Sequence, residues 1–237
     1  MAFFDDYPAF CGSGRTAAIP RRLNLRHRAI IEANQDILAG ARVLDLASHD
    51  GRWSFAALEA GATHVSGVEA RPRLVAAANR TFARYGATQD RYEFIQGDLF
   101  RILDQRAFNV DVVLCLGFLY HTLRYSELFQ GITQTGARHC ILDTRILVSE
   151  EPLVQVGIDR THRRANAAED DRTVEGRTLV GDPSLPALEL MLGVYGFEIE
   201  KPFDWAALLN SLPGDERGIA GYGTGRRVTL RCRHGSV

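Results

Sequence analysis

From residue 42 onward, short apolar runs alternate with longer stretches whose apolar residues recur at helical spacing. The runs are almost uniformly apolar, which is typical of parallel strands that are buried on both faces. The expected strands are 42–46, 64–68, 92–95, 111–116 and 140–143, and the expected helices between them are 52–60, 72–85, 98–106 and 126–135. This order predicts an α/β fold with a doubly wound, mostly parallel sheet.

Both ends of the chain extend this pattern. Residues 22–39 predict one helix that ends at Gly40, and the aromatic and glycine-containing residues before it predict an irregular arm. Towards the C-terminus, a helix at 185–195 and strands at 197–200 and 227–232 complete the sheet. We therefore expect seven strands, including an antiparallel edge strand.

The segment 149–182 interrupts the alternation. It is polar and rich in charge, with the sequence AAEDD at 167–171. Connections of this length inside a compact domain are usually functional. A hairpin or lid over a pocket is one interpretation, and a solvated surface insertion is the other.

Composition and charge exclude several classes of protein. The chain has 237 residues, a net charge of −1 and 46% apolar residues, and none of its apolar runs approaches the roughly 20 residues of a membrane helix. The N-terminus lacks the basic cluster of a secretory signal. Positive charges are spread along the chain, which argues against a nucleic-acid partner. The four cysteines form no CxxC pair, so we expect no zinc site and a cytoplasmic location.

The most informative stretch is 43–70, VLDLASHDGRWSFAALEAGATHVSGVEA. It predicts a strand, a tight turn, a helix and a second strand, with Asp45 late in the first strand and Glu69 ending the second. Open parallel sheets bind ligands beyond the carboxyl ends of their strands. A carboxylate at that position can accept hydrogen bonds from both hydroxyls of a ribose. Glu69 is thus a candidate nucleoside ligand, or else a solvated turn residue.

This stretch resembles the first motif of class I methyltransferases that use S-adenosylmethionine (SAM), D/E-x-G-x-G-x-G, which precedes an acidic residue after the second strand. The three glycine positions hold Ala47, His49 and Gly51, so only the third glycine is kept. Ala47 leaves room for a ligand, whereas the His49 side chain must point away from it or contact it. SAM has no phosphates and tolerates a turn with fewer glycines than a pyrophosphate needs. The departure therefore favours SAM over NAD or FAD.

The resemblance continues after the third and fourth strands. It implies that Asp98 lies near the adenine amino group and that Leu99 packs on the ring. It also implies that Cys115 and Leu116 flank the methionine portion of SAM. Taken alone, Asp98 could instead cap the helix that follows it.

The resemblance is close over residues 40–145, whereas over residues 184–232 only the order of the expected helices and strands is similar. It implies one methyltransferase domain with a Rossmann-like fold. The expected parts are an N-terminal arm and helix at 1–40, a SAM-binding core at 41–145, a lid insertion at 149–182 and the C-terminal part of the sheet at 184–232.

Candidate catalytic residues follow the fourth and fifth strands. Methyl transfer requires alignment of the acceptor with the sulfonium methyl group and, for a hydroxyl, removal of a proton. His121 is a candidate general base because imidazole titrates near neutral pH; otherwise it packs at the start of the next helix. Tyr120 contacts the substrate or belongs to the core.

Asp143 ends the fifth strand. It could orient an acceptor hydroxyl, assist His121 or bind Mg²⁺, or else form a salt bridge with Arg145 or another arginine. The acidic residues of 169–171 could add metal ligands or form a solvated charge run. Mg²⁺ is thus a candidate cofactor whose ligands are undetermined.

Two further resemblances concern the acceptor. The sequence LGFLYHT at 116–122 is similar to bacterial enzymes that modify a wobble uridine in tRNA with carboxy-SAM. Such enzymes need a basic tRNA face and a cation for the additional carboxylate, for which Arg15, Arg52 and Arg145 are candidates. The chain length, the aromatic arm and the SHDG turn resemble a sugar O-methyltransferase of methylmannose polysaccharide synthesis. This resemblance implies methylation of a mannoside hydroxyl with Mg²⁺ assistance.

The favoured interpretation is methyl transfer from SAM to a hydroxyl of a small molecule, such as a sugar. A tRNA-modifying carboxy-SAM enzyme and a SAM-binding module without catalysis remain as alternatives. The aromatic arm could pack against a second subunit of a homodimer or close over its own pocket.

Overall fold

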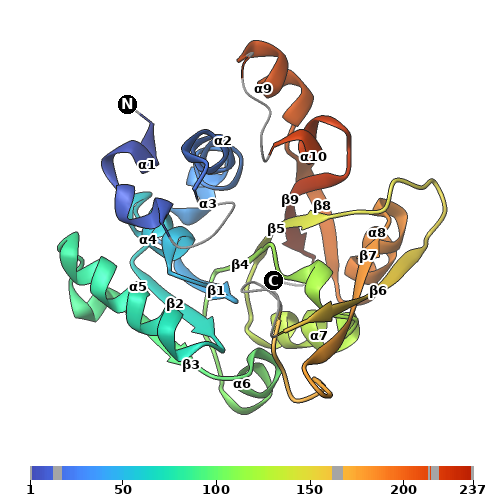
Figure 1. Cartoon of the computed structure of the whole chain (residues 1–237), viewed down its shortest axis with the longest axis horizontal. Helices are drawn as coiled ribbons and strands as arrows, with labels where there is room; N and C mark the ends of the chain where they lie inside the picture. The colour runs from blue at the N-terminus through green and yellow to red at the C-terminus, as the bar shows by residue number, and fades with distance from the viewer. Residues whose placement is uncertain (1, 13–17, 162–167, 213, 215–218, 236–237) are drawn as a thin grey trace.

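The computed structural model describes residues 2–12, 18–161, 168–212, 214 and 219–235. Its main sheet has seven strands in the order β3-β2-β1-β4-β5-β9-β8 (Figure 1). The strands are β1 (Arg42–Leu46), β2 (His64–Glu69), β3 (Tyr92–Gln96), β4 (Val112–Leu116), β5 (His139–Arg145), β8 (Phe197–Pro202) and β9 (Arg227–His234). The strands β1 to β5 pair in parallel, which confirms the predicted doubly wound sheet. The antiparallel strand is β9, and β8 pairs along its outer side.

Helices cover both faces of this sheet. The α-helices are α1 (Phe3–Asp6), α2 (Pro20–Ile30), α3 (Gln35–Leu38), α4 (Arg52–Glu59), α5 (Pro72–Arg84), α6 (Leu99–Gln105), α7 (Tyr125–Gln134), α8 (Leu185–Val194), α9 (Trp205–Ser211) and α10 (Ala220–Gly223). Short 3₁₀ segments are η1 (Pro8–Cys11), η2 (Glu32–Asn34), η3 (Gln89–Arg91) and η4 (Leu119–His121). No helix of the described residues is long and apolar enough to span a bilayer.

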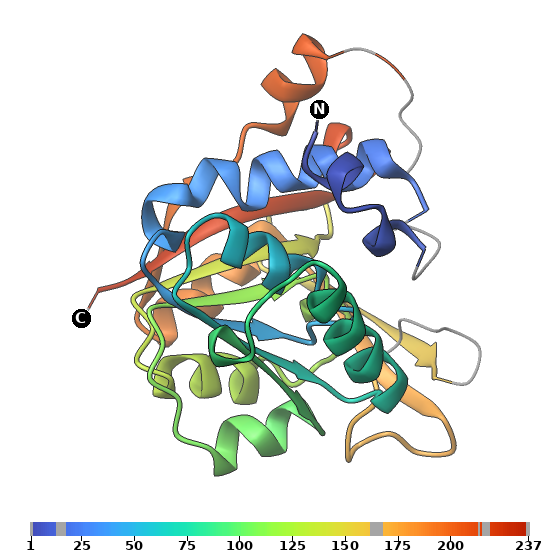
Figure 2. The ribbon, with the colours of Figure 1, turned by 90° about the vertical axis from the view of Figure 1, so that its left-hand side faces the viewer.

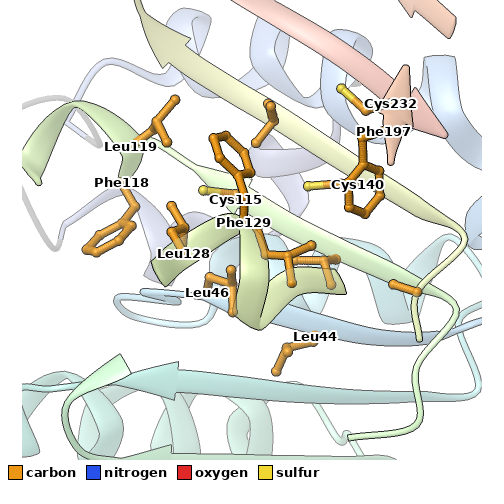
Figure 3. Packing of buried hydrophobic residues seen from close by; sticks show 14 of the residues in the cluster. Leu44, Leu46, Cys115, Phe118, Leu119, Leu128, Phe129, Cys140, Phe197 and Cys232 are labelled. Atoms are coloured by element: carbon orange, nitrogen blue, oxygen red, sulfur yellow. The ribbon is translucent and has the colours of Figure 1, made fainter. Parts of the chain in front are cut away.

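Two apolar clusters hold the layers together. One joins the sheet to α6, α7 and α8, and Figure 3 shows part of it, where Cys115, Cys140 and Cys232 lie among leucine and phenylalanine side chains. The other joins the opposite face to α1, α2, α4 and α5. These three cysteines are buried and reduced, and they behave as small apolar residues.

The predicted helix at 22–39 is interrupted. The helix α2 ends at Ile30, and η2 separates it from α3. The Asn34 side chain donates hydrogen bonds to the carbonyls of Ala29 and Ile30. An asparagine side chain can compete in this way with helical hydrogen bonds, and the pattern of apolar residues does not report it.

The described part of the N-terminal arm, residues 2–12, is largely helical instead of irregular. Phe3 stacks on His27 and Phe4 meets Trp53 edge to face. The Tyr7 ring contacts Phe55. These contacts bind the described part of the arm to α2 and α4 of its own domain.

The insertion forms a separate two-stranded hairpin of β6 (Val154–Arg160) and β7 (Arg177–Pro183). Figure 2 shows it on the side towards which the arrowheads of the parallel strands point. The Tyr125 hydroxyl on α7 donates to the Gly181 carbonyl at 2.7 Å and ties the hairpin to the domain. The predicted hairpin is therefore present, at the end of the sheet where ligands are expected.

Candidate active site

A cavity of about 680 Å³ lies at the carboxyl ends of the parallel strands. Its walls come from the ends of β1, β2, β4 and β5, from α2 and β9, and from residues 168–170 of the insertion. Eight of the residues expected from the sequence line it: Asp45, Ala47, His49, Glu69, Leu99, Leu116, Tyr120 and His121. The other four, Gly51, Asp98, Cys115 and Asp143, lie outside the lining.

The turn after β1 keeps a glycine-like backbone without its first two glycines. Ala47 has φ 53° and His49 has φ 56°, and Gly51 follows with φ 76°. All three positions of the resembled motif are thus left-handed, a conformation that costs an ordinary residue roughly 1–2 kcal/mol. The geometry of the motif is kept although its glycine sequence is not.

Gly51 shapes this turn from outside the cavity. It is the N-cap of α4, and a Cβ atom here would lie 2.6 Å from Cζ of Phe94. Both the positive φ and the close contact require glycine.

The Glu69 carboxylate is fixed at the end of β2. One oxygen accepts a hydrogen bond from the His49 amide at 3.0 Å, and the other accepts from the Arg71 amide at 2.9 Å. Each carboxylate oxygen has a further lone-pair position. The two oxygens can therefore still accept hydrogen bonds from a ribose in the cavity.

Asp45 is buried beneath the same turn. It accepts a hydrogen bond from the Ser54 hydroxyl at 2.6 Å. Burial raises the pKa of Asp45 to about 7, against the opposing effect of Ser54, and the nearby Asp50 and Glu69 carboxylates raise it further. A cationic ligand would favour the ionised form.

Asp98 is the N-cap of α6. One of its oxygens accepts from the amides of Phe100 and Arg101, and the other accepts from the Asp171 amide at 2.7 Å. Asp98 therefore caps a helix, the alternative role considered for it, and its contact with adenine stays a prediction, while Leu99 does line the cavity. Cys115 is fully buried behind the cavity wall.

His121 lines the cavity from η4 and pairs with a residue that the sequence did not reveal. Its Nδ1 lies 2.7 Å from Oδ2 of Asp159 on β6. The side chains are 12% and 5% exposed, so this pair is largely shielded from water. Asp159 occupies an inward position of β6, but only the fold shows which residue it meets.

Tyr120 lies between the histidine and two arginines. Its ring centre is 4.3 Å from that of His121. The guanidiniums of Arg145 and Arg227 lie over the ring at 4.3 and 5.2 Å from its centre. Tyr120 thus belongs to the cavity wall.

The predicted contact between Asp143 and the acceptor is wrong, because Asp143 does not reach the cavity. It is completely buried and accepts from Arg26 at 2.9 Å and from Arg227 at 2.6 Å, together with the hydroxyls of Tyr222 and Thr229. Burial alone would raise the pKa of Asp143, but the two guanidiniums outweigh it and hold this pKa well below its usual range. Asp143 is therefore an ionised anchor for arginines, although not for Arg145.

The acidic residues of the insertion are engaged with the domain. Glu169 and Asp170 line the cavity, and Asp170 and Asp171 pair with Arg124 at 3.4 and 2.7 Å. Across the described ranges, three or more His, Cys, Asp or Glu side chains nowhere gather into a metal site. The described residues therefore do not support the expectation of Mg²⁺ bound through Asp143.

Of the three arginines considered for a carboxylated donor, Arg52 and Arg145 line the cavity. Arg52 pairs with Asp50 at 2.7 Å and Arg145 with Asp182 at 3.0 Å. Arg15 lies outside the described residues.

Known protein families and solved structures were compared with this chain, and part of the chain matches a methyltransferase family. Residues 43–135 match the family described as "Methyltransferase domain". No protein of curated function matches the chain.

Solved structures share the fold at low sequence identity. A SAM-dependent methyltransferase from Mesorhizobium loti has 17% identity and a TM-score of 0.59, over 88% of this chain and 96% of that one. Magnesium protoporphyrin IX methyltransferase from Synechocystis, with bound SAM, has 16% identity and a TM-score of 0.60, over 98% and 91%. The N-terminal domain of EvdMO1, with S-adenosylhomocysteine (SAH) and D-fucose, has 20% identity and a TM-score of 0.58, over 88% and 81%.

The chain thus has the fold of the SAM-dependent methyltransferases among these structures, and its residues 43–135 match a methyltransferase domain family.

Proposed function

We propose that this protein is a SAM-dependent methyltransferase and that it transfers the methyl group of SAM to a hydroxyl of a small molecule, with sugars such as mannosides as the first candidates. The cavity supports this proposal because it joins a nucleoside end at Glu69 to a proton-accepting end at His121.

In this proposal, the turn after β1 and the carboxyl ends of β1 and β2 bind the methyl donor, SAM. Glu69 accepts hydrogen bonds from the ribose, and Ala47 lets the donor approach the turn closely. Asp45 places negative charge under the cationic donor. These residues orient the sulfonium towards the end of β4, where Tyr120 and His121 lie.

His121 is the general base in this proposal. The 2.7 Å contact with Asp159 favours a proton on Nδ1, which leaves Nε2 free to accept the proton of the acceptor hydroxyl. The hydroxyl oxygen forms a bond to the methyl carbon as the carbon–sulfur bond breaks. Its proton passes to His121, and the donor leaves as neutral SAH.

The choice of sugars rests on the resemblance of the SHDG turn and on one structural neighbour. The N-terminal domain of EvdMO1 was solved together with SAH and D-fucose. A cavity of about 680 Å³ is within the usual size range of small-molecule sites.

The test measures SAH formed from SAM in the presence of mannosides and other monosaccharides. Replacing His121 with Ala should lower turnover by about 10²–10⁴-fold, the usual contribution of a general base, and leave the affinity for SAH unchanged. His64→Ala, at the opposite end of β2, is the matched control and should retain turnover. Full turnover with full SAM affinity in His121→Ala would exclude the proposed base.

A further inference from the structure

We propose that two copies of this chain associate through the outer face of the β6–β7 hairpin, and that this contact stabilises the strand that holds Asp159 against His121. The outer hairpin face consists of Val156, Ile158, Val174 and Leu179. The association itself is independent of the proposed function, whereas its effect on turnover rests on that function.

Strand pairing places these four side chains on one face. Ile158 lies opposite Leu179 in the register of β6 and β7. Val156 lies two residues before Ile158 and therefore shares its face. Val174 pairs with Arg177, which lies two residues before Leu179, so Val174 belongs to the same face. Asp159 alternates with these residues and lies on the opposite face, where it contacts His121.

The outer hairpin face is large enough for a stable contact. Its side chains are exposed by 59% at Val156, 61% at Ile158, 65% at Val174 and 57% at Leu179. At roughly 100 Å² each they present on the order of 400 Å² of apolar surface, an area that often marks an interaction site. Each partner in a standard interface contributes about 800 Å², of which somewhat more than half is apolar. The four side chains thus supply most of the apolar area that one partner needs.

This face is also complementary to itself. Ile158 and Leu179 form its middle row, Val156 lies one row to one side on β6, and Val174 lies one row to the other side, beyond β7. A two-fold axis through the middle row therefore places Ile158 of one copy on Leu179 of the other, and Val156 near Val174. Such a contact closes after two copies. A second copy of this chain is accordingly the partner that the face fits.

The charges around the face favour a protein partner over a lipid surface. Arg160 and Arg177 form the row next to Ile158 and Leu179. Arg177 is paired at 2.7 Å with Glu175, whose side chain is 76% exposed. Anionic lipid surfaces attract apolar side chains that are bordered by cations alone. A border with both signs is typical of the polar rim of a protein interface.

The same two strands connect this face to the candidate active site. A hairpin of two strands is marginally stable unless other elements pack on it. Its described contacts with the domain include the Tyr125 hydroxyl at Gly181 and the 2.7 Å contact between Asp159 and His121. A second copy on the outer face would enclose the strands from both sides. Association should therefore hold Asp159 more firmly against the imidazole.

The experiment is sedimentation velocity without donor or acceptor, over a wide range of protein concentrations. The variants are Ile158→Glu and Leu179→Thr, each at an exposed position of the hairpin where the monomer tolerates a polar side chain. Leu190→Glu is the matched control, because Leu190 lies on α8, outside the outer hairpin face, and is 62% exposed. Amide hydrogen exchange in residues 154–160 and 177–183 is measured at the lowest and the highest concentration.

We expect the unmodified chain to reach twice its monomer mass of 26.3 kDa as its concentration rises. Ile158→Glu should weaken association at least roughly tenfold, because two carboxylates would be buried without partners. Leu179→Thr should weaken it less, and Leu190→Glu should associate as the unmodified chain does. Exchange in the hairpin should slow as the dimer forms, and turnover per chain should rise with it.

Four results would overturn the inference: a monomer at every concentration, a dimer of undiminished affinity in both hairpin variants, equal exchange in monomer and dimer, or sedimentation of the monomer with phosphatidylglycerol vesicles through this face. The last result would assign the face to a lipid surface. The mass and exchange measurements need no reaction, so a lack of methyl transfer would contradict the proposed function and leave the association to be judged by itself.

Discussion

At the scale of single residues, Asp45 lines the cavity and has a raised pKa, so its charge should respond to a cationic ligand there. Its carboxyl is buried, and its pKa of about 7 lies well above the value of about 3.9 expected in an unfolded chain. The folded protein therefore binds a proton more tightly than the unfolded chain does. This contribution to stability is complete below about pH 4 and is lost as the pH rises through about 7.

We accordingly predict that the ligand-free protein loses thermal stability between about pH 4 and pH 7 through Asp45. Asp45→Asn should flatten this part of the profile because an amide does not ionise. Thermal unfolding followed across this pH range measures both slopes, with the surface variant Asp90→Asn as control. Identical slopes for Asp45→Asn and the unmodified chain would refute the assignment.

Asp159 acts through His121 in the proposed mechanism, so it is a positioning residue. We predict that Asp159→Asn lowers kcat by about tenfold to a hundredfold, because the imidazole loses its fixed tautomer and orientation. The KM for SAM and the affinity for SAH should not change. Steady-state kinetics and calorimetry separate these effects, and Asp104→Asn on the exposed side of α6 is the control. A change in KM alone would show a structural role instead.

The glycine kept in the turn should be far more sensitive than a glycine on an exposed helix. Gly51→Ala combines a positive φ with a 2.6 Å contact to Phe94 and should cost about 2 kcal/mol or more in the free energy of unfolding. Gly193→Ala on α8 meets no atom within 4 Å and should stabilise the fold by up to about 1 kcal/mol. Denaturant unfolding of both variants measures the contrast, which would be absent if the turn could relax.

At the scale of elements, the β6–β7 hairpin is joined to the cavity at two places. Asp159 contacts His121 on one side. On the other side, Arg124 at the N-cap of α7 pairs with Asp170 and Asp171 and lies over the Phe100 ring at 3.7 Å from its centre. The insertion thus supplies both a candidate positioning residue and part of the wall.

We predict that Arg124→Ala detaches the second of these contacts. Amide hydrogen exchange in residues 168–183 should become faster, and the affinity for SAH should fall by a few-fold because this wall contacts the cavity. Arg172→Ala removes a more exposed and longer contact with Asp171, at 3.8 Å, and should leave both quantities unchanged. Unchanged exchange in Arg124→Ala would mean that the hairpin is held by its other contacts alone.

At the scale of the whole molecule, local patterns predicted the framework well. The apolar runs predict the strands of the parallel sheet to within a few residues, and the acidic residues at the carboxyl ends of β1 and β2 indicate the position of the cavity. These features can be predicted from the sequence because each depends on consecutive residues: the strand, the turn and the carboxylate lie within one stretch of the chain.

Features that depend on distant partners could not be predicted in this way. Asp159 meets His121 across 38 positions, and Asp143 meets Arg26 across 117. An aspartate at a strand end has the same local sequence whether it faces a ligand or anchors a buried arginine. Only the packed fold distinguishes these roles, so the sequence predicts Asp143 in the cavity and gives no signal for Asp159.

Donor binding by Glu69 is the basis of the proposed function, and calorimetric titration with SAH tests it directly. The unmodified chain should bind SAH, and Glu69→Gln should bind it at least roughly tenfold more weakly because an amide replaces the carboxylate that accepts the ribose hydrogen bonds. Glu93→Gln, on β3 and outside the cavity lining, should bind as the unmodified chain does. No uptake of SAH by the unmodified chain, or equal affinity in Glu69→Gln, would contradict the account.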